Sequence, residues 1–233
     1  MTCETFWTSI PLGIAYFLTY AQWEVLGVFF ARSLGPTEIV TWTLLGIVWY
    51  LMKYITDGLV DAAQLRCCQW LISNQPLMAK KASQKAHFVS LSLSVVLVST
   101  LFMTGNELVE WMTIDLVLQR MMIEVFPLLG LGLIVQTVGA ISFSVISAQQ
   151  DRIRMTHFIQ FVGSWILAPL LGGIFCFLLR IDLQGLASAV VLGLAVSGAG
   201  QTYLLMKSDW TRIASKVSKG LALSSGTVES PVQ

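Results

Sequence analysis

Charged residues are scarce in this sequence. Lys, Arg, Asp and Glu together make up 12% of its 233 residues, whereas hydrophobic residues make up 55%. A soluble domain usually carries about a quarter charged residues, so this chain lacks the polar surface that a soluble domain of its size needs. The net charge of +1 provides no basic surface for nucleic acid. The composition therefore predicts an integral membrane protein, in contact with the lipid bilayer and without a nucleic-acid partner.

The sequence also lacks recognisable sites for metals, cofactors or catalysis. Its cysteines show no CxxC or Cys/His spacing that would bind a metal, and they are Cys3, Cys67, Cys68 and Cys176. The two histidines, His87 and His157, are far apart in sequence and are interpreted as polar residues at membrane boundaries. No nucleophile–base pair and no phosphate-binding loop is recognisable. We therefore expect no enzymatic activity, no metal and no cofactor.

Long apolar runs dominate what remains. A transmembrane helix needs about 20 mostly apolar residues, and helices are the default because unpaired backbone groups are costly in lipid. The sequence therefore predicts an all-α membrane protein, a bundle of six transmembrane helices within residues 1–215. The six expected spans cover residues 7–31, 39–60, 87–103, 121–147, 156–179 and 183–206.

Basic residues in the loops predict how the bundle is oriented. Ten of them lie in the loops after the second and fourth spans and in the tail after the sixth, and three lie in the opposite loops. Cytoplasmic loops carry the excess of Lys and Arg, so both termini are expected in the cytoplasm. The sequence does not indicate whether a plasma membrane, a vacuole or another organelle holds the protein.

Three segments are expected outside the spans. Residues 65–85 are polar and are expected to form a cytoplasmic connector, and residues 216–233 a disordered cytoplasmic tail. Residues 107–118 alternate acids with apolar residues and predict a short interfacial helix, with Trp111 near the headgroups. Within the fifth span, Trp165 and Pro169 predict a kink, because proline lacks a backbone donor.

Glu24 is the most informative charge within a span. It lies past the middle of the first span, toward its outer side, with Gln22 and Trp23 beside it. Ionisable residues inside membranes are costly and are functional candidates by default. A single carboxylate can hold a proton or a cation but not both at once, which is the minimal chemistry of a cation/proton exchanger. The alternative is a structural carboxylate hydrogen-bonded to a neighbouring helix.

Three further charges follow one another along the second span. Lys53, Asp57 and Asp61 occur at i, i+4 and i+8, which places them on one helix face. One interpretation is an internal Lys53–Asp57 ion pair, with Asp61 reaching toward the interface near Arg66. The other is a polar stripe that lines a water-filled cavity and binds protons or cations.

A motif at the end of the second span resembles the multidrug and toxic compound extrusion (MATE) transporters. The second helix of each lobe in that family ends with a similar pattern, and the matching residues are Gly58, Ala62, Ala63, Arg66, Leu71, Pro76, Ala79 and Lys80. The sequence departs from this pattern at Gln69, Ile72 and Asn74, and Asp61 stands where the family is normally apolar. Collinear with the motif, Trp23-Glu24 resembles the seventh helix of eukaryotic members, and Trp165–Gly172, including Pro169, resembles the eleventh.

The resemblance implies the second lobe, helices seven to twelve, of a transporter with two lobes of six helices. Family members move organic cations outward through a central cleft, in exchange for protons or sodium. Glu24 then holds the exchanged cation, with Tyr20 and Trp23 as aromatic candidates in the cleft. Gln136, a further cleft candidate, stands where many eukaryotic relatives have a glutamate, so the implied mechanism depends mainly on Glu24.

One lobe alone has no opposing wall, because such transporters work by rocking one repeat against another. The chain is therefore expected to be a truncated part of a longer protein, to pair with a second copy of itself, or to need a separate first lobe. Met1 stands only a few residues before the first span, which favours truncation. Alternative functions are a lipid or lipid-linked flippase of the same superfamily and a non-transporting assembly subunit.

Overall fold

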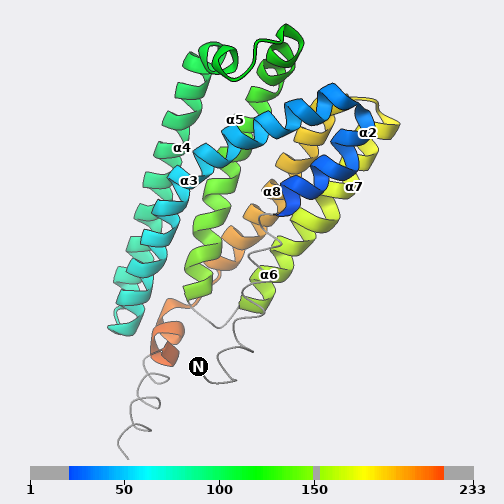
Figure 1. The fold of residues 1–233 in the computed structure, drawn as a ribbon. Coiled ribbons are helices and arrows are strands. Elements are labelled where there is room, and N and C mark those ends of the chain that lie inside the picture. The colour runs from blue at the N-terminus through cyan, green and yellow to red at the C-terminus, as the bar shows by residue number, and fades with distance from the viewer. Residues whose placement is uncertain (1–20, 149–152, 218–233) are drawn as a thin grey trace, which may run out of the picture.

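The computed structural model describes residues 21–148 and 153–217, and they form an up-and-down bundle of helices (Figure 1). Helical residues 21–26 lead into the π-helical segment η1 (Gly27–Ala31) and the short α2 (Arg32–Leu34). The long helices α3 (Pro36–Ile72), α4 (Pro76–Met112) and α5 (Leu116–Ala148) follow. The chain then runs through α6 (Ile153–Phe161), η2 (Val162–Leu167), α7 (Ala168–Gly173) and η3 (Ile174–Leu178) to α8 (Asp182–Met206).

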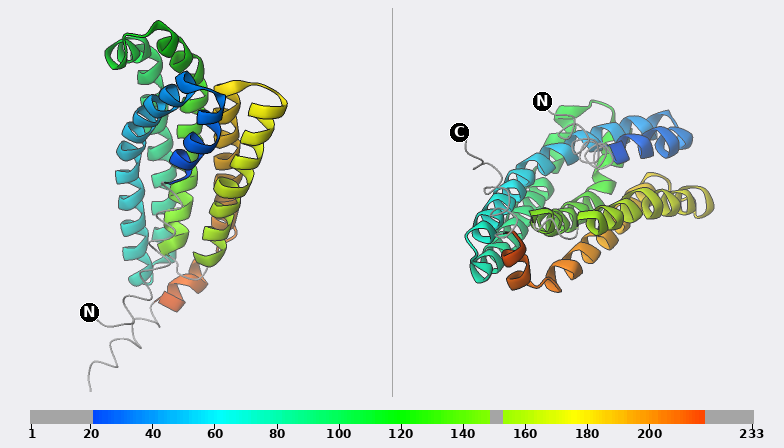
Figure 2. Two further views of the ribbon diagram at one scale, coloured as in Figure 1. Left: turned by 45° about the vertical axis from the view of Figure 1, so that its right-hand side comes forward. Right: turned by 90° about the horizontal axis from the view of Figure 1, so that it is seen from below.

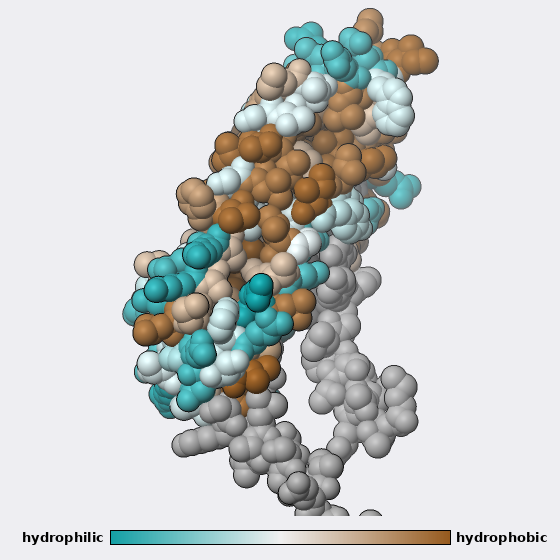
Figure 3. All heavy atoms as spheres, turned by 90° about the vertical axis from the view of Figure 1, so that its left-hand side faces the viewer, coloured by the Kyte–Doolittle hydropathy of each residue, from teal (hydrophilic) through white to brown (hydrophobic). Residues whose placement is uncertain are grey.

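Five helices in the described residues are long and apolar enough to cross a membrane: Pro36–Ile72, Pro76–Met112, Leu116–Ser147, Arg154–Leu178 and Asp182–Met206. They confirm a multi-pass helical protein and correspond to the second to sixth expected spans. The first expected span lies largely outside the described residues. On the face drawn in Figure 3, hydrophobic residues occupy the middle of the molecule and hydrophilic residues gather toward its ends.

Residues 65–85, expected as a connector, are almost entirely helical. The helices α3 and α4 extend beyond the expected spans, and only residues 73–75 separate them. Asn74 has a left-handed φ of 52°, a conformation that asparagine tolerates better than most residues. The Gln75 N–H donates to the Trp70 carbonyl at 2.9 Å, and Pro76 begins the next helix, where its missing N–H costs no hydrogen bond. Polar residues here lengthen the helices instead of ending them.

The prediction of a short interfacial helix over residues 107–118 is wrong. Residues up to Met112 continue α4, and α5 already begins at Leu116. Thr113 is extended, and the Val117 N–H donates to Asp115 Oδ1 at 2.8 Å. Asp115 thereby satisfies a free donor in the first turn of α5, as capping side chains do. Trp111 nevertheless remains highly exposed, at 86%.

The fifth span departs from α-helical geometry on both sides of Pro169. The π-helical segment η2 precedes α7, and η3 follows it. Proline 169 has no N–H to donate to the carbonyl of Trp165, so the α-helical bond between them cannot form. Short π-helical segments inside helices accommodate such interruptions. The irregular backbone predicted at this proline is therefore present as π-helical turns.

Helix α5 stands between two groups of helices. It contacts α3 and α4 on one side and α8 on the other (Figure 2). The turn at residues 73–75 and the turn after α8 lie at one end of the bundle, and residues 113–115 and 179–181 lie at the other end (Figure 1). The basic loop after the second span and the described part of the basic tail after α8, both expected in the cytoplasm, thus share one end. Which end faces the cytoplasm stays a prediction.

A short helix over residues 210–217 packs against the turn between α3 and α4. Ile213 and Ala214 form a buried cluster with Leu71 and Ala79. Asp209 begins this helix, and its carboxylate accepts hydrogen bonds from the Thr211 side chain and from the backbone N–H groups of Thr211 and Arg212. These bonds, the Thr211 hydroxyl first, lower the pKa of Asp209, because they stabilise its charged form.

Close backbone contact between the fifth span and α8 depends on glycine. A Cβ at Gly163 would lie 2.6 Å from the Gly193 carbonyl oxygen and 2.8 Å from Ser197 Cβ. These neighbours are backbone and a β-carbon, so no side-chain rotation can relieve the clash. Small residues are the usual means by which membrane helices approach this closely.

We predict that Gly163→Ala destabilises the bundle by about 1–3 kcal/mol, the usual cost of overpacking. Gly58→Ala is the matched control, because a Cβ there has no neighbour within 4 Å. Thermal unfolding of the two purified variants in the same detergent measures the difference. Equal midpoints for Gly163→Ala and Gly58→Ala would contradict the packing seen here.

Candidate functional site

Three tryptophans pack the first described helix against α3. The Trp23 and Trp42 rings stack with centroids 4.0 Å apart, and Trp49 lies on Trp23 at 5.9 Å. The Trp42 indole N–H donates to the Trp23 carbonyl at 3.1 Å. Stacked aromatic pairs contribute about 0.5–1.5 kcal/mol beyond their buried area. The stack therefore fixes the position of Trp23 and of the residues beside it.

Gly46 on α3 makes room for the Trp23 ring. A Cβ at this position would lie 2.5 Å from Trp23 Nε1, so no larger residue fits without moving the indole. The indole N–H itself is buried and has no hydrogen-bond partner among the described residues. The ring lines two cavities, one that also has Glu24 on its wall and one that is lined mainly by buried residues.

The first cavity lies beside Glu24 and has a volume of about 140 Å³. Its lining includes the rings of Trp23, Trp42 and Tyr50 together with the Glu24 side chain. Glu24 is exposed and makes no hydrogen bond or ion pair within the described part of the chain. The alternative of a carboxylate bonded to a neighbouring helix is therefore not what these residues show.

The second cavity lies deeper and is lined by polar side chains from several helices. It holds about 30 Å³, and the polar side chains around it are Gln22, Tyr50, Lys53, Gln136 and Gln160. Trp23, Trp49 and apolar residues of α8 complete the wall. Gln160 is already engaged, since it accepts from Gln201 at 2.8 Å and donates to Ser164 at 3.0 Å. Four separate helical segments thus contribute polar groups to one small space.

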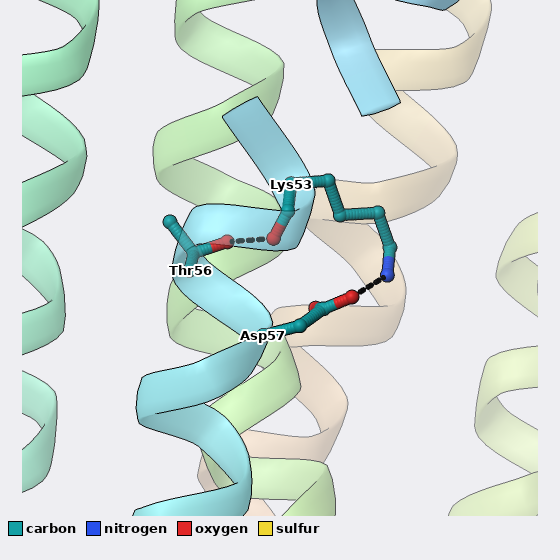
Figure 4. A network of polar contacts seen from close by, with 3 residues as sticks. All are labelled: Lys53, Thr56 and Asp57. Atoms are coloured by element: carbon teal, nitrogen blue, oxygen red, sulfur yellow. Dashed lines mark hydrogen bonds and ion pairs between the residues drawn. The ribbon is translucent and has the colours of Figure 1, made fainter. Parts of the chain in front are cut away.

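Lys53 and Asp57 form an ion pair one turn apart on α3 (Figure 4). Lys53 Nζ lies 2.6 Å from Asp57 Oδ2, and the lysine is only 7% exposed. The Thr56 hydroxyl donates to the Lys53 carbonyl at 2.8 Å. Charges in an apolar interior must be compensated, because their desolvation is expensive. The structure therefore confirms the ion-pair interpretation, and it also places Lys53 on the wall of the inner cavity.

The remaining predicted residues lie apart from the two cavities. Asp61 and Arg66 are exposed farther along α3, and they form no ion pair in the part of the chain that the structure describes. The polar stripe thus ends at Asp57. Gly58 is exposed with open space around it, and Pro169 lies in the fifth span, among π-helical turns. Tyr20 lies outside the described residues.

Gln136 and Trp23, both predicted for the cleft, are brought together at the inner cavity. Sequence reasoning noted Gln22 only as a neighbour of Glu24 and did not find Gln160. Gln160 is a lone amide in the fifth span, and an amide among apolar residues is the signal that could have found it. Within the described residues, no group of three or more His, Cys, Asp or Glu side chains is placed to hold a metal.

A separate polar chain near the other end of the bundle was also missed. His87 on α4 lies 2.8 Å from the Ser83 carbonyl through Nδ1 and 2.9 Å from Ser142 Oγ on α5 through Nε2. Ser142 Oγ in turn lies 3.0 Å from Thr202 Oγ1 on α8. His87 was interpreted as a boundary residue, but it bonds to Ser142 of α5, and Ser142 extends the chain to Thr202 of α8.

Comparison with solved structures relates the fold to a known transporter. The chain superposes on a eukaryotic MATE transporter, AtDTX14, with a TM-score of 0.84 and 17% sequence identity. The match covers 93% of this chain and 48% of the transporter chain, so this chain spans about half of that protein's length. No protein-family model and no curated protein matches the sequence. The chain therefore has the fold of about half of a MATE transporter.

We predict unequal costs for breaking the ion pair at Lys53. Asp57→Asn removes the carboxylate beside a deeply buried ammonium and should cost up to about 3–5 kcal/mol, whereas Lys53→Met leaves the more exposed carboxylate and should cost less. The double variant Lys53→Met/Asp57→Asn leaves no charge and should recover most of the loss. Thermal unfolding of the purified variants measures all three.

The exposed pair between Arg120 and Glu124, at 3.1 Å, supplies the control. Arg120→Gln should cost less than about 1 kcal/mol, as surface pairs do. A double variant no more stable than Asp57→Asn alone would show that the two charges do not compensate each other.

Proposed function

We propose that this chain forms the cation-binding part of a membrane transporter that exports organic cations in exchange for protons or sodium. The observation that carries the proposal is the exposed carboxylate of Glu24, which lines a cavity with aromatic walls. The MATE fold supplies the context of a transporter.

The depth of Glu24 supports this proposal. Glu24 precedes the end of α2 at Leu34 by ten residues, which is roughly 15 Å along a helix and about half of a bilayer's hydrocarbon thickness. A carboxylate that faced lipid at this depth would be costly. The face that carries Glu24 is therefore suited to an aqueous cleft and not to the lipid.

The cavity also fits an organic cation chemically. Glu24 supplies a negative charge, and the Trp23, Trp42 and Tyr50 rings line the same space. Tryptophan and tyrosine faces attract cations by about 0.5–2 kcal/mol per contact. The volume of about 140 Å³ is suited to a small alkylammonium group and not to a large drug.

The proposed exchange uses the single charge of Glu24. The ionised carboxylate holds the cation when the cleft opens to the cytoplasm. When the cleft opens outward, a proton neutralises the carboxylate, and the cation loses its counter-charge and leaves. Because one carboxylate holds one cation or one proton, the two fluxes are coupled. Sodium in place of the proton would act through the same competition.

The proposed cleft needs an opposing wall. In this proposal a first lobe or a second copy of the chain supplies it, since rocking of one repeat against another gives alternating access. The exposed position of Glu24 is compatible with either partner.

We predict that Glu24→Gln reduces proton-driven efflux at least tenfold, because the amide cannot exchange a proton for a cation. Membrane vesicles from cells expressing the chain, loaded with radiolabelled tetramethylammonium and given an imposed pH gradient, measure the efflux. Repeating the assay with a sodium gradient identifies the coupling ion. Glu110→Gln is the matched control, since Glu110 is exposed near the far end of α4.

Efflux that Glu24→Gln leaves unchanged would overturn the role of this carboxylate. Suppose that vesicles from cells expressing the chain show no more gradient-driven efflux than vesicles from cells lacking it. This result would count against transport itself and would favour an assembly subunit.

A further inference from the structure

We propose that the inner cavity, between Gln22, Lys53 and Gln136, binds a neutral hydrogen-bond-accepting group of the transported molecule, such as a carbonyl or ether oxygen. This inference rests on the proposed function and adds to it a substrate class. The exported molecule would carry both a cation and, a short distance away, an uncharged acceptor.

Gln22 provides the first argument. Its side chain lines the inner cavity and is 8% exposed, and its Nε2 atom has no hydrogen-bond partner among the described residues. Leaving a buried donor unsatisfied costs about 1–3 kcal/mol, so such groups normally have a partner. Gln136 lines the same cavity and makes no hydrogen bond within the described residues either. The cavity therefore offers two amides without partners to whatever enters it.

The charge on the wall decides what kind of group is favoured. Lys53 lines the inner cavity, whereas its counter-ion Asp57 does not. The ion pair thus presents its positive end to the cavity while its net charge stays zero. A second cation would be repelled there. A full anion would be buried without a compensating charge, which is costly, so a neutral group with a partial negative atom fits best.

Size and position complete the argument. A cavity of about 30 Å³ has room for a group slightly larger than one water molecule, such as a carbonyl. Trp23 and Tyr50 line both this cavity and the one beside Glu24. A molecule whose ammonium lies at Glu24 therefore reaches the inner cavity by passing these two rings. The two sites together select a molecule with both groups.

A matched pair of small ligands tests this inference. Acetylcholine and n-pentyltrimethylammonium share the same cationic group and the same chain length, and only acetylcholine carries the ester oxygens. We expect the chain in lipid nanodiscs to bind acetylcholine about two- to tenfold more tightly by isothermal titration calorimetry, the range for one net hydrogen bond. Gln22→Leu should bring this ratio close to one without changing the affinity for pentyltrimethylammonium.

Two other variants make the test decisive. Gln84→Leu is the matched control, because Gln84 is exposed near the start of α4 and lines neither cavity, and it should leave the ratio unchanged. Gln136→Leu should lower the ratio as Gln22→Leu does, and it answers the question if Gln22→Leu fails to fold. A ratio near one in the parent chain, or a ratio that neither variant changes, would overturn the inference and leave the cavity to water.

Glu24→Gln separates this inference from the proposed function. This variant should weaken the binding of both ligands about tenfold and leave the ratio of their affinities unchanged. If Glu24→Gln weakens the binding of both ligands but the parent chain binds the two ligands equally tightly, the proposed acceptor site is wrong and the proposed cation site stands. If the ratio holds but Glu24→Gln weakens neither ligand, the role of Glu24 is wrong and the acceptor site stands.

Discussion

A charge inside an apolar bundle must be compensated nearby, and in this protein the compensation at Lys53 organises the centre of the molecule. The lysine is almost fully buried, and Asp57 one turn away neutralises it at 2.6 Å. The pair costs desolvation energy, so it is poor evidence for stability alone. The pair gives the inner cavity a positively charged group on its wall, because Lys53 lines the cavity and Asp57 does not.

The tryptophan stack contributes Trp23 to the walls of both cavities. Trp23 lies against Trp42 and Trp49, and Gly46 admits its ring. On one side of this ring is an exposed carboxylate, and on the other a buried ammonium with amides around it. The two cavities that share Trp23 therefore differ in charge character.

The position of Gln136 bears on the chemistry of the inner cavity. In the resemblance to MATE transporters, Gln136 stands where many eukaryotic relatives have a glutamate, so the implied mechanism depends mainly on Glu24. The structure places Gln136 on the same cavity as Lys53, where a second acid would bind the lysine instead of a substrate. An amide at this position preserves a neutral, hydrogen-bonding wall.

Composition and apolar length were enough to predict a helical membrane protein and the positions of five described spans, because lipid admits few other structures. The i, i+4 spacing likewise predicted the Lys53–Asp57 pair, since both residues lie on one helix. Helix ends were harder to predict. Polar residues near 65–85 continue α3 and α4, because a helix satisfies its own backbone hydrogen bonds and can extend beyond the lipid. The start of α5 is capped by the Asp115 side chain.

The two cavities could not be predicted from the sequence. Gln22, Gln136 and Gln160 lie on three helices far apart along the chain, and His87, Ser142 and Thr202 do so as well. Patterns within one helix do not report which faces of different helices meet. The sequence by itself determined that the chain lies in a lipid bilayer, that it crosses the bilayer as helices, and which charged residues those helices carry into the membrane. Only the tertiary structure decided which of these charges share a cavity, because that depends on close packing between α3, α5, α8 and the first described helix.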